Sequence, residues 1–268
     1  QNNVKYSNII MGKPWCGEEG FYIDDKNLSL DEFIFRFGGP YKNFKVDVVI
    51  PFFNEEHNVK KTHENQMKLN KLFNIKKYIY VNNGSTDKTL DSLNNLATRD
   101  KKIKVINLEE NNGYGFGMKE GIKYSKSDII ITNHADGQFD GYSFFQTHLD
   151  SIQHDRNSLN IIPRRMNRSR FDYINTMILK FLISLITLKK IDDFNGQPKL
   201  FKREEVGNIE EYPNDYTFDF FLFRKLYGNF KALPIIQKDR VHGISSWSGN
   251  IFKRLKFFFG YISAAFKR

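Results

Sequence analysis

Three short apolar runs, each followed directly by polar and glycine residues, constrain the fold of this chain more than any other feature. The runs cover residues 46–50, 78–81 and 128–132 and are rich in Val and Ile. Apolar runs of this length, bounded by turn residues, are typical of buried parallel strands. We therefore predict an α/β fold with a mostly parallel central sheet and helices on both faces.

The polar residues that follow the three runs indicate a ligand site. They occupy residues 51–56, 82–87 and 133–138, directly after the predicted strands. In an open α/β sheet, ligands bind outside the carboxyl ends of the strands. We therefore expect a nucleotide or phosphate site where the three clusters meet.

The same three clusters resemble motifs of the family 2 glycosyltransferases. They occur in the expected order, and the resemblance extends over about residues 46–259. It is strongest to the branch that transfers a sugar to a polyprenyl phosphate, as dolichol-phosphate mannose synthase does. The resemblance implies a GT-A type, Rossmann-like domain. It also implies an inverting enzyme that moves a sugar from a nucleoside-diphosphate sugar to a polyprenyl-phosphate-type acceptor. The segments that carry it are Asp47-Val48-Val49-Ile50-Pro51-Phe52-Phe53-Asn54-Glu55-Glu56, Val81-Asn82-Asn83-Gly84-Ser85-Thr86-Asp87 and His134-Ala135-Asp136-Gly137-Gln138.

The third cluster stands at the place of the family's metal motif. A divalent ion held by carboxylate and phosphate oxygens neutralises a nucleoside diphosphate as it leaves. The family usually has Asp-x-Asp, whereas this chain has His134 and Asp136. The resemblance implies Asp136 as the catalytic metal ligand, with His134 and Gln138 as helpers. The ion that the resemblance implies is Mg²⁺ or Mn²⁺, and an imidazole ligand slightly favours manganese. The alternative is a polar strand end that binds no metal.

Asn82 and Asn83 replace two aspartates of the family, one of which contacts the nucleotide base. An amide accepts a hydrogen bond from a base N–H and also offers a donor. We therefore expect a nucleoside pocket with an altered base preference. The resemblance implies that Pro51, Asn54 and Glu55 line the same pocket.

Two glycines are further candidates for substrate contact. Gly113 lies in a turn that resembles the family's Asn-x-Gly-x-Gly, although a purely conformational role for it is equally compatible. Gly196 follows Asp192 and Asp193 in a segment where the family's glycine lets the backbone approach sugar or diphosphate. The two aspartates are candidate acceptors for sugar hydroxyls, or simply part of a loop that ends a helix.

Asp219 occupies the place of an acidic residue that acts as general base in relatives with a hydroxyl acceptor. A phosphate acceptor is already an anionic nucleophile and needs no base, so a catalytic and an orienting role both remain open. Arg240, with His242 and Ser245 beside it, resembles the family's Arg-x-x-Gly-x-Ser. The resemblance implies a contact to the diphosphate or the acceptor phosphate. A basic surface turn is the alternative.

The basic balance of the chain favours anionic partners. Lys and Arg number 41 against 31 acidic residues, a net charge of +10. Residues 163–170 carry four arginines suited to a phosphate acceptor, although a solvated loop is the preferred interpretation for any single one. Residues 174–188 are too short and too polar to span a membrane, and the polyprenyl branch has an amphipathic helix here. Residues 250–268 interleave aromatic and basic residues. We therefore expect peripheral membrane contact.

The length of 268 residues fits one large α/β domain with additions. We expect an N-terminal extension of unknown role at 1–45, the glycosyltransferase domain at 46–249 and a basic aromatic tail at 250–268. The single cysteine, Cys16, excludes an internal disulfide and a cysteine-based zinc cluster. We therefore expect a cytoplasmic protein at the cytoplasmic face of a membrane. The chain begins at Gln1 without a signal-peptide pattern, which is compatible with a fragment.

Other interpretations remain open. The protein could transfer to a sugar hydroxyl of a cell-surface glycan with Asp219 as base. It could also be a degenerate, non-catalytic nucleotide-sugar-binding module, because Asn82, Asn83 and His134 all replace acidic residues. Nucleic-acid binding is least favoured, since no known motif accompanies the charge. On a helix predicted at 55–73, His57 and His63 do not share a face, so we predict solvated histidines there instead of a metal pair.

Overall fold

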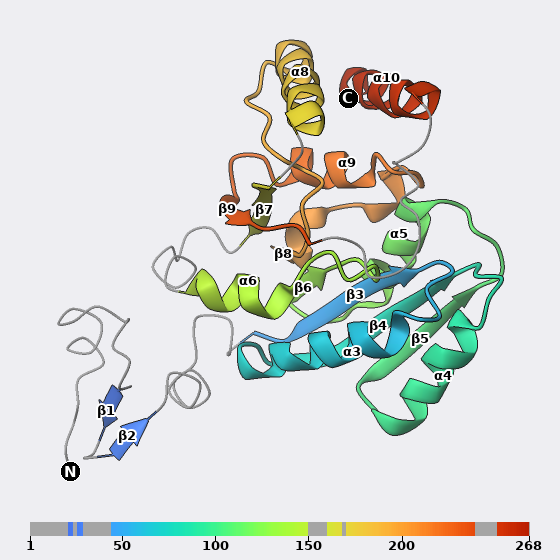
Figure 1. The fold of residues 1–268 in the computed structure, drawn as a ribbon, viewed down its shortest axis with the longest axis vertical. Helices are drawn as coiled ribbons and strands as arrows, with labels where there is room; N and C mark the ends of the chain where they lie inside the picture. Colours follow the sequence, from blue (N-terminus) through green and yellow to red (C-terminus); the bar gives the residue numbers. More distant parts are fainter. Residues whose placement is uncertain are drawn as a thin grey trace.

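A computed structural model describes residues 21–23, 26–28, 44–149, 160–167, 170–238 and 251–267. A hairpin of β1 (Phe21–Ile23) and β2 (Lys26–Leu28) precedes the main sheet. The main sheet has seven strands in the order β5-β4-β3-β6-β8-β7-β9 (Figure 1). Their bounds are β3 (Val46–Phe52), β4 (Ile75–Asn83), β5 (Ile103–Leu108), β6 (Ile129–Thr132), β7 (Ile161–Arg165), β8 (Lys199–Lys202) and β9 (Lys231–Ile235).

Helices alternate with strands through the first half of the described chain and gather toward its end. The α-helices are α3 (Val59–Met67), α4 (Thr89–Arg99), α5 (Tyr114–Tyr124), α6 (Gly141–Thr147), α8 (Arg170–Thr187), α9 (Phe218–Lys225) and α10 (Ile251–Phe266). Short 3-10 turns are η1 (Lys68–Lys71), η2 (Arg203–Val206) and η3 (Ile209–Glu211).

The strand directions gather the predicted ligand clusters at one edge of the sheet. β3 runs parallel to both β4 and β6, and β4 runs parallel to β5. β8 is antiparallel to β6 and β7, while β7 and β9 are parallel. The predicted mostly parallel α/β sheet is therefore confirmed. Because β3, β4 and β6 share a direction, the polar residues after each strand meet at the same edge.

The sheet separates two hydrophobic cores, as alternation along buried strands requires. In β3, Val48 and Ile50 face the core that α3, α4 and α6 cover, whereas Val49 faces the other. The second core contains Met118 of α5 together with residues of α8, α9 and α10, among them Tyr261. Helices therefore cover both faces (Figure 1), as predicted.

The predicted solvated position of His63 is wrong. Helix α3 buries Val59, Thr62, His63 and Gln66 against the sheet, a face at helical spacing that is mostly polar. The Nδ1 atom of His63 lies 2.9 Å from the hydroxyl of Tyr80 on β4. Apolar periodicity does not mark such a face, so a search for apolar positions at helical spacing misses it. His57 is exposed, as predicted.

Candidate active site

The loops after β3 and β4 are tied together by hydrogen bonds. Asn54 adopts a left-handed backbone with φ of 54°, and its N–H donates to Ser85 Oγ at 3.1 Å. Its Oδ1 accepts from the N–H of Thr86 at 2.8 Å. The N–H of Glu55 donates to Thr89 Oγ1 at 2.9 Å. Asn54 and Glu55, both predicted to line the nucleoside pocket, thus join the loop after β3 to the loop after β4.

Asp87 also joins the two loops, and it accepts a hydrogen bond from the first residue of α4. Its Oδ1 accepts from the N–H of Thr89 at 2.9 Å and its Oδ2 from the N–H of Glu56 at 3.2 Å. Partial burial acts to raise the pKa of Asp87, but the hydrogen bonds from Thr89 and Glu56 hold it below its ordinary value. Asp87 therefore satisfies the backbone N–H of the first residue of α4.

Asn82 and Asn83 sit at the end of β4 with their amide nitrogens engaged. Asn82 Nδ2 donates to Asn107 Oδ1 at 2.7 Å, and Asn83 Nδ2 donates to the carbonyl of Gly113 at 3.0 Å. Within the described residues, the Oδ1 atoms of both side chains are buried without a hydrogen-bond partner. Unpaired buried acceptors are costly, and each amide therefore keeps one acceptor oxygen that a further donor could satisfy.

Gly113 begins α5 with φ of 104°, a backbone that favours glycine. A Cβ there would collide with the carbonyl oxygen of Asn214. The buried Lys119 on the same helix holds the segment that contains Asn214. Its Nζ donates to the carbonyl of Tyr212 at 3.1 Å and to Asn214 Oδ1 at 2.9 Å. Conformation and packing thus account for Gly113. Pro51 lies close by, 3.3 Å from where a Cβ on Gly117 would stand.

The predicted metal residues follow β6. Asp136 is 3% exposed, and its Oδ1 accepts from the N–H of Gln138 at 3.1 Å. His134 is half-buried beside Tyr114, with ring centroids 5.5 Å apart. Gln138 is half-buried, and its carbonyl accepts from the N–H of Lys238 at 2.8 Å. The three candidates therefore lie on one short loop at the ligand edge.

The possible metal ligands of this loop fit a divalent ion that binds together with its substrate. Among the described residues, no three His, Cys, Asp or Glu side chains are grouped as a metal cage. Divalent ions in phosphate sites commonly take one or two carboxylates and complete their shell with phosphate oxygens and water. Asp136, with His134 beside it, matches that partial set.

Asp219 lies at the centre of a buried network. Its Oδ1 is 2.9 Å from Nζ of Lys199, a side chain with no exposed surface. Its Oδ2 accepts from the hydroxyl of Tyr114 at 3.2 Å. Burial lowers the pKa of Lys199, and the charge of Asp219 opposes that effect. Tyr114 in turn lies 3.2 Å from Nε2 of His134. The network therefore connects Asp219 to the predicted metal loop.

Sequence reasoning missed Lys199 and Tyr114. Lys199 pairs with Thr132 across the β6–β8 register, which places it beside the residue that precedes the metal loop. A lysine inside an apolar strand is rarely buried unless paired, and its partner Asp219 is 20 residues away. The lysine in the run Lys199-Leu200-Phe201 was the available signal.

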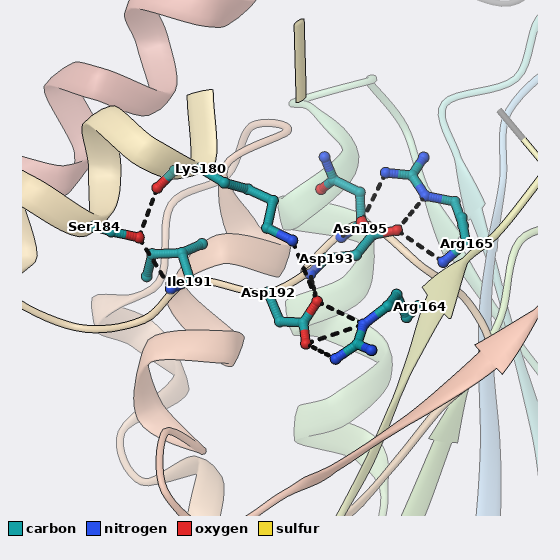
Figure 2. A network of polar contacts seen from close by, with 8 residues as sticks. All are labelled: Arg164, Arg165, Lys180, Ser184, Ile191, Asp192, Asp193 and Asn195. Carbon is teal, nitrogen blue, oxygen red and sulfur yellow. Dashed lines mark hydrogen bonds and ion pairs between the residues drawn. The ribbon is translucent and has the colours of Figure 1, made fainter. Parts of the chain in front are cut away.

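The predicted solvated loop at Arg164 and Arg165 is wrong, because both lie in β7. Figure 2 shows that each faces one of two consecutive aspartates. Arg165 Nε and Nη2 contact Asp193 at 2.8 Å each, and Arg164 pairs with Asp192. Burial acts to raise the pKa of Asp192, but Arg164 and Lys180 hold it below its ordinary value. Both aspartates, predicted to accept sugar hydroxyls, therefore have arginine partners.

Close packing against β7 explains why residue 196 is a glycine. A Cβ there would collide with the carbonyl oxygen of Pro163 in β7. Arg240, His242 and Ser245 lie outside the described residues. Lys238, two positions before Arg240, bonds through its backbone to Gln138 of the metal loop.

Helices α8 and α10 pack side by side (Figure 1) and expose apolar side chains that we call the α8/α10 apolar face. On α8 they recur every fourth residue, which keeps them on one side of the helix. No helix among the described residues has both the length and the hydropathy needed to cross a bilayer. The members of the face are Tyr173, Ile174, Met177, Ile178, Phe181, Leu185, Leu255, Phe259 and Phe266.

Comparisons with known proteins agree with this architecture. The mannosyltransferase PcManGT from Pyrobaculum calidifontis, in complex with GDP-Man and Mn²⁺, has a TM-score of 0.60 at 16% identity, covering 98% of this chain and 70% of that chain. The glucosyl-3-phosphoglycerate synthase from Mycobacterium tuberculosis, in complex with Mn²⁺ and UDP, has a TM-score of 0.60 at 14% identity, covering 83% and 78%. These likenesses show a shared fold, the GT-A type.

Curated relatives match at low identity. The bactoprenol glucosyl transferase of Shigella phage SfV is 23% identical over 209 residues, covering 76% of this chain and 67% of that protein. CsbB of Bacillus subtilis (strain 168), named as a glycosyltransferase, is 24% identical over 210 residues, covering 76% of this chain. The match spans only 62% of the length of CsbB. The model of glycosyl transferase family 2 matches residues 47–226, more than half of the chain. Together with the three motif clusters at one sheet edge, this match shows that the chain belongs to glycosyltransferase family 2.

Proposed function

We propose that this protein is an inverting, metal-dependent glycosyltransferase that moves a sugar from a nucleoside-diphosphate sugar to a polyprenyl-phosphate-type acceptor. Family membership supports the reaction class. A relative whose name gives bactoprenol as its acceptor supports the lipid class. Inversion at the anomeric carbon follows from the family resemblance.

The hydrogen bonds that Asp219 already accepts are the observation that favours a phosphate acceptor. One carboxylate oxygen is held by the buried Lys199 and the other by the hydroxyl of Tyr114. A general base must reach the proton that it removes, and here both carboxylate oxygens already accept hydrogen bonds, one from Lys199 and one from Tyr114. A lipid phosphate is anionic before it enters the site and requires no base. Asp219 then orients the site instead of taking a proton.

The donor side is proposed from the ligand edge of the sheet. The unpaired Oδ1 atoms of Asn82 and Asn83 would accept from N–H groups of the base. Asp136, with His134 and Gln138, would hold a divalent ion. When bound, such an ion neutralises the negative charge that develops on the leaving diphosphate. Arg240, aided by His242 and Ser245, would bind diphosphate or acceptor phosphate.

Peripheral membrane contact is proposed from the α8/α10 apolar face. The exposed Arg170, Lys189, Lys190 and Lys256 lie on or next to the same two helices. Apolar side chains beside basic ones suit the interface of an anionic bilayer. Flotation with anionic vesicles should recover the wild type, and Phe181→Glu should lose most of that binding. Equal flotation of both proteins would contradict the proposal.

The function is tested by incubating the protein with radiolabelled UDP- or GDP-sugars, Mn²⁺ and a polyprenyl phosphate. The expected product is a labelled glycolipid, formed neither from the dephosphorylated lipid nor by Asp136→Ala. At saturating Mn²⁺, Asp219→Asn should lower kcat by less than about tenfold, because no proton is removed from the acceptor. Loss of a general base would lower kcat by about 10²–10⁴-fold.

The other outcomes identify the alternatives. Transfer to a glycan hydroxyl, with a large loss in Asp219→Asn, would replace the lipid acceptor and restore Asp219 as base. Nucleotide-sugar binding without turnover on any acceptor would indicate the degenerate binding module. Both results would contradict the proposed reaction.

A further inference from the structure

The buried hydroxyl of Thr62 makes a hydrogen bond that leaves its own helix. Thr62 lies on the inward face of α3 and is 5% exposed. Its Oγ1 donates to the carbonyl of Ala135 at 2.9 Å, across 73 positions of the chain. A threonine inside a helix can satisfy its hydroxyl on the carbonyl four residues earlier, as Thr187 of α8 does with Ile183 at 2.8 Å. The hydroxyl of Thr62 instead joins α3 to the loop after β6.

The carbonyl that accepts this bond belongs to the predicted metal loop, residues 133–138. Ala135 is itself 5% exposed and lies in the same hydrophobic core as Val59 of α3. Its carbonyl is part of the peptide unit whose nitrogen belongs to Asp136. Because a peptide unit is planar, a bond that fixes this carbonyl also fixes the backbone nitrogen of Asp136. The position from which the Asp136 side chain starts is therefore set in part by Thr62.

Backbone hydrogen bonds anchor the loop at its two ends. At its start, the N–H of Asn133 donates to the carbonyl of Val49 at 3.2 Å. At its end, the carbonyl of Gln138 accepts from the N–H of Lys238 at 2.8 Å. The hydrogen bond from Thr62 supports the stretch between these two anchors, which contains the predicted metal ligand.

The start of α3 is tied to the loops that are expected to line the nucleoside pocket. The carbonyl of Glu55 accepts from the N–H of Asn58 at 2.8 Å, and the N–H of Glu55 donates to Thr89 Oγ1 at 2.9 Å. One turn further along, the N–H of Thr62 donates to the carbonyl of Asn58 at 2.8 Å. A continuous series of hydrogen bonds therefore connects Glu55 to Ala135 through the first turn of α3.

We propose that Thr62 is a positioning residue for the divalent-ion site. Its hydroxyl holds the metal loop against α3 in the geometry in which Asp136 binds the ion. Through the first turn of α3, the same contact links that loop to the loops that receive the nucleoside. The inference rests on the proposed function, since the ion is the one that accompanies the nucleoside diphosphate. It gives a reason for a polar residue at a buried position of α3.

Two substitutions of Thr62 separate its hydroxyl from its methyl group. Thr62→Val removes the hydroxyl and keeps the shape of the side chain, whereas Thr62→Ser keeps the hydroxyl. The affinity for Mn²⁺ is measured by paramagnetic resonance of the free ion with UDP or GDP present. We expect Thr62→Val to weaken Mn²⁺ binding about tenfold, at the lower end of the losses that follow when the support of a metal ligand is removed. Thr62→Ser should bind Mn²⁺ nearly as tightly as the wild type.

The matched control is Thr187→Val, which removes a threonine hydroxyl that is bonded within its own helix. This variant should bind Mn²⁺ as the wild type does. Equal Mn²⁺ affinities of the wild type and Thr62→Val would overturn the proposal. Losses of the same size in Thr62→Val and Thr62→Ser would also overturn it, because the hydroxyl would then not be the group that matters.

A second readout uses the different geometric demands of two ions. Mg²⁺ requires nearly ideal octahedral coordination, whereas Ca²⁺ accepts flexible geometries. A displaced metal loop should therefore weaken Mg²⁺ binding more than Ca²⁺ binding, while a smaller folded fraction would lower both equally. Calorimetric titration of UDP or GDP in the presence of each ion compares the two losses in Thr62→Val. Equal fold-losses for the two ions would contradict a positioning role.

Two results separate this inference from the proposed function. If the wild type binds ion and nucleotide and Thr62→Val binds them equally well, only the positioning role fails. If the wild type binds neither, the proposed function fails as well. Thermal unfolding checks that each variant is folded. If Thr62→Val is not folded, Thr62→Ala and Thr62→Ser, which differ only by the hydroxyl oxygen, decide the question in the same Mn²⁺ assay, and equal affinities of these two variants would overturn the proposal.

Discussion

Two neighbouring arginines of β7 provide a matched test of how burial sets the strength of an ion pair (Figure 2). Arg165 and Asp193 have side chains only 14% and 7% exposed, whereas Arg164 and Asp192 are 51% and 19% exposed. Both pairs join the same strand to the same loop. The perturbations are Arg165→Met and Arg164→Met, which keep an apolar stem and remove the charge.

Removing one member of a buried pair costs about 3–5 kcal/mol, because an uncompensated charge remains. Asp193 would keep two backbone donors in Arg165→Met, the N–H of residue 165 at 3.0 Å and that of Asn195 at 3.2 Å. We therefore expect the lower end, about 3 kcal/mol. Arg164→Met should cost no more than about 1 kcal/mol, because the Arg164 side chain is half exposed and water screens its charge. Asp192 also retains Lys180 at 3.4 Å.

Urea unfolding at constant pH measures both costs, and double-mutant cycles with Asp193→Asn and Asp192→Asn isolate the pair energies. The cycle for Arg165 should give a coupling well above that for Arg164. Added salt should change the cost of Arg164→Met more than that of Arg165→Met. Equal costs for the two variants would refute the argument from burial.

Two further predictions concern stability. Burial lowers the pKa of His63, with Asp100 opposing, so the unfolded chain binds the proton more readily. The free energy of unfolding should then fall as pH drops below about 6.5, by at most ~1.4 kcal/mol per pH unit. Denaturant titrations should show that slope reduced in His63→Gln and kept in His57→Gln; an unchanged slope in His63→Gln would exclude this cause. Gly196→Ala should destabilise by about 1–3 kcal/mol in the same assay because its Cβ meets the Pro163 carbonyl. Gly141→Ala, whose Cβ would make ordinary contacts at 3.5 Å, should be neutral or mildly stabilising; equal losses in the two glycine variants would contradict the collision.

The sheet was predictable from sequence because its strands are buried on both faces and end in turn residues. Residues 46–50 and 128–132 appear as β3 and β6, with bounds shifted by at most two residues. Local apolar runs and the turn residues that bound them carry this information.

The polar interior was not predictable by the same means. The inward face of α3 carries Thr62, His63 and Gln66, so an apolar pattern misses it. Lys199 and Asp219 can be buried because they pair with each other, and nothing in the local sequence links them. Buried polar groups are defined by partners distant in the chain, which single-sequence patterns do not contain.

The candidate site, too, was predictable from the sequence only in part. Its place at the carboxyl edge of β3, β4 and β6 follows from strand order and the motif clusters. The engaged nitrogens of Asn82 and Asn83, by contrast, emerge only from the hydrogen bonds to Asn107 and Gly113. Those bonds turn two amides into acceptors, in the manner of the carboxylates that they replace.

The central claim, a metal-dependent donor site at this edge, is tested most directly by calorimetric titration of UDP and GDP with and without Mn²⁺. We expect one nucleotide to bind only with the metal. Asp136→Ala should weaken that binding at least tenfold, about 1.4 kcal/mol, whereas the exposed control Asp91→Ala should not. If neither nucleotide binds the wild type under any condition, the asparagine and histidine replacements have disabled the site, and the enzymatic account is wrong.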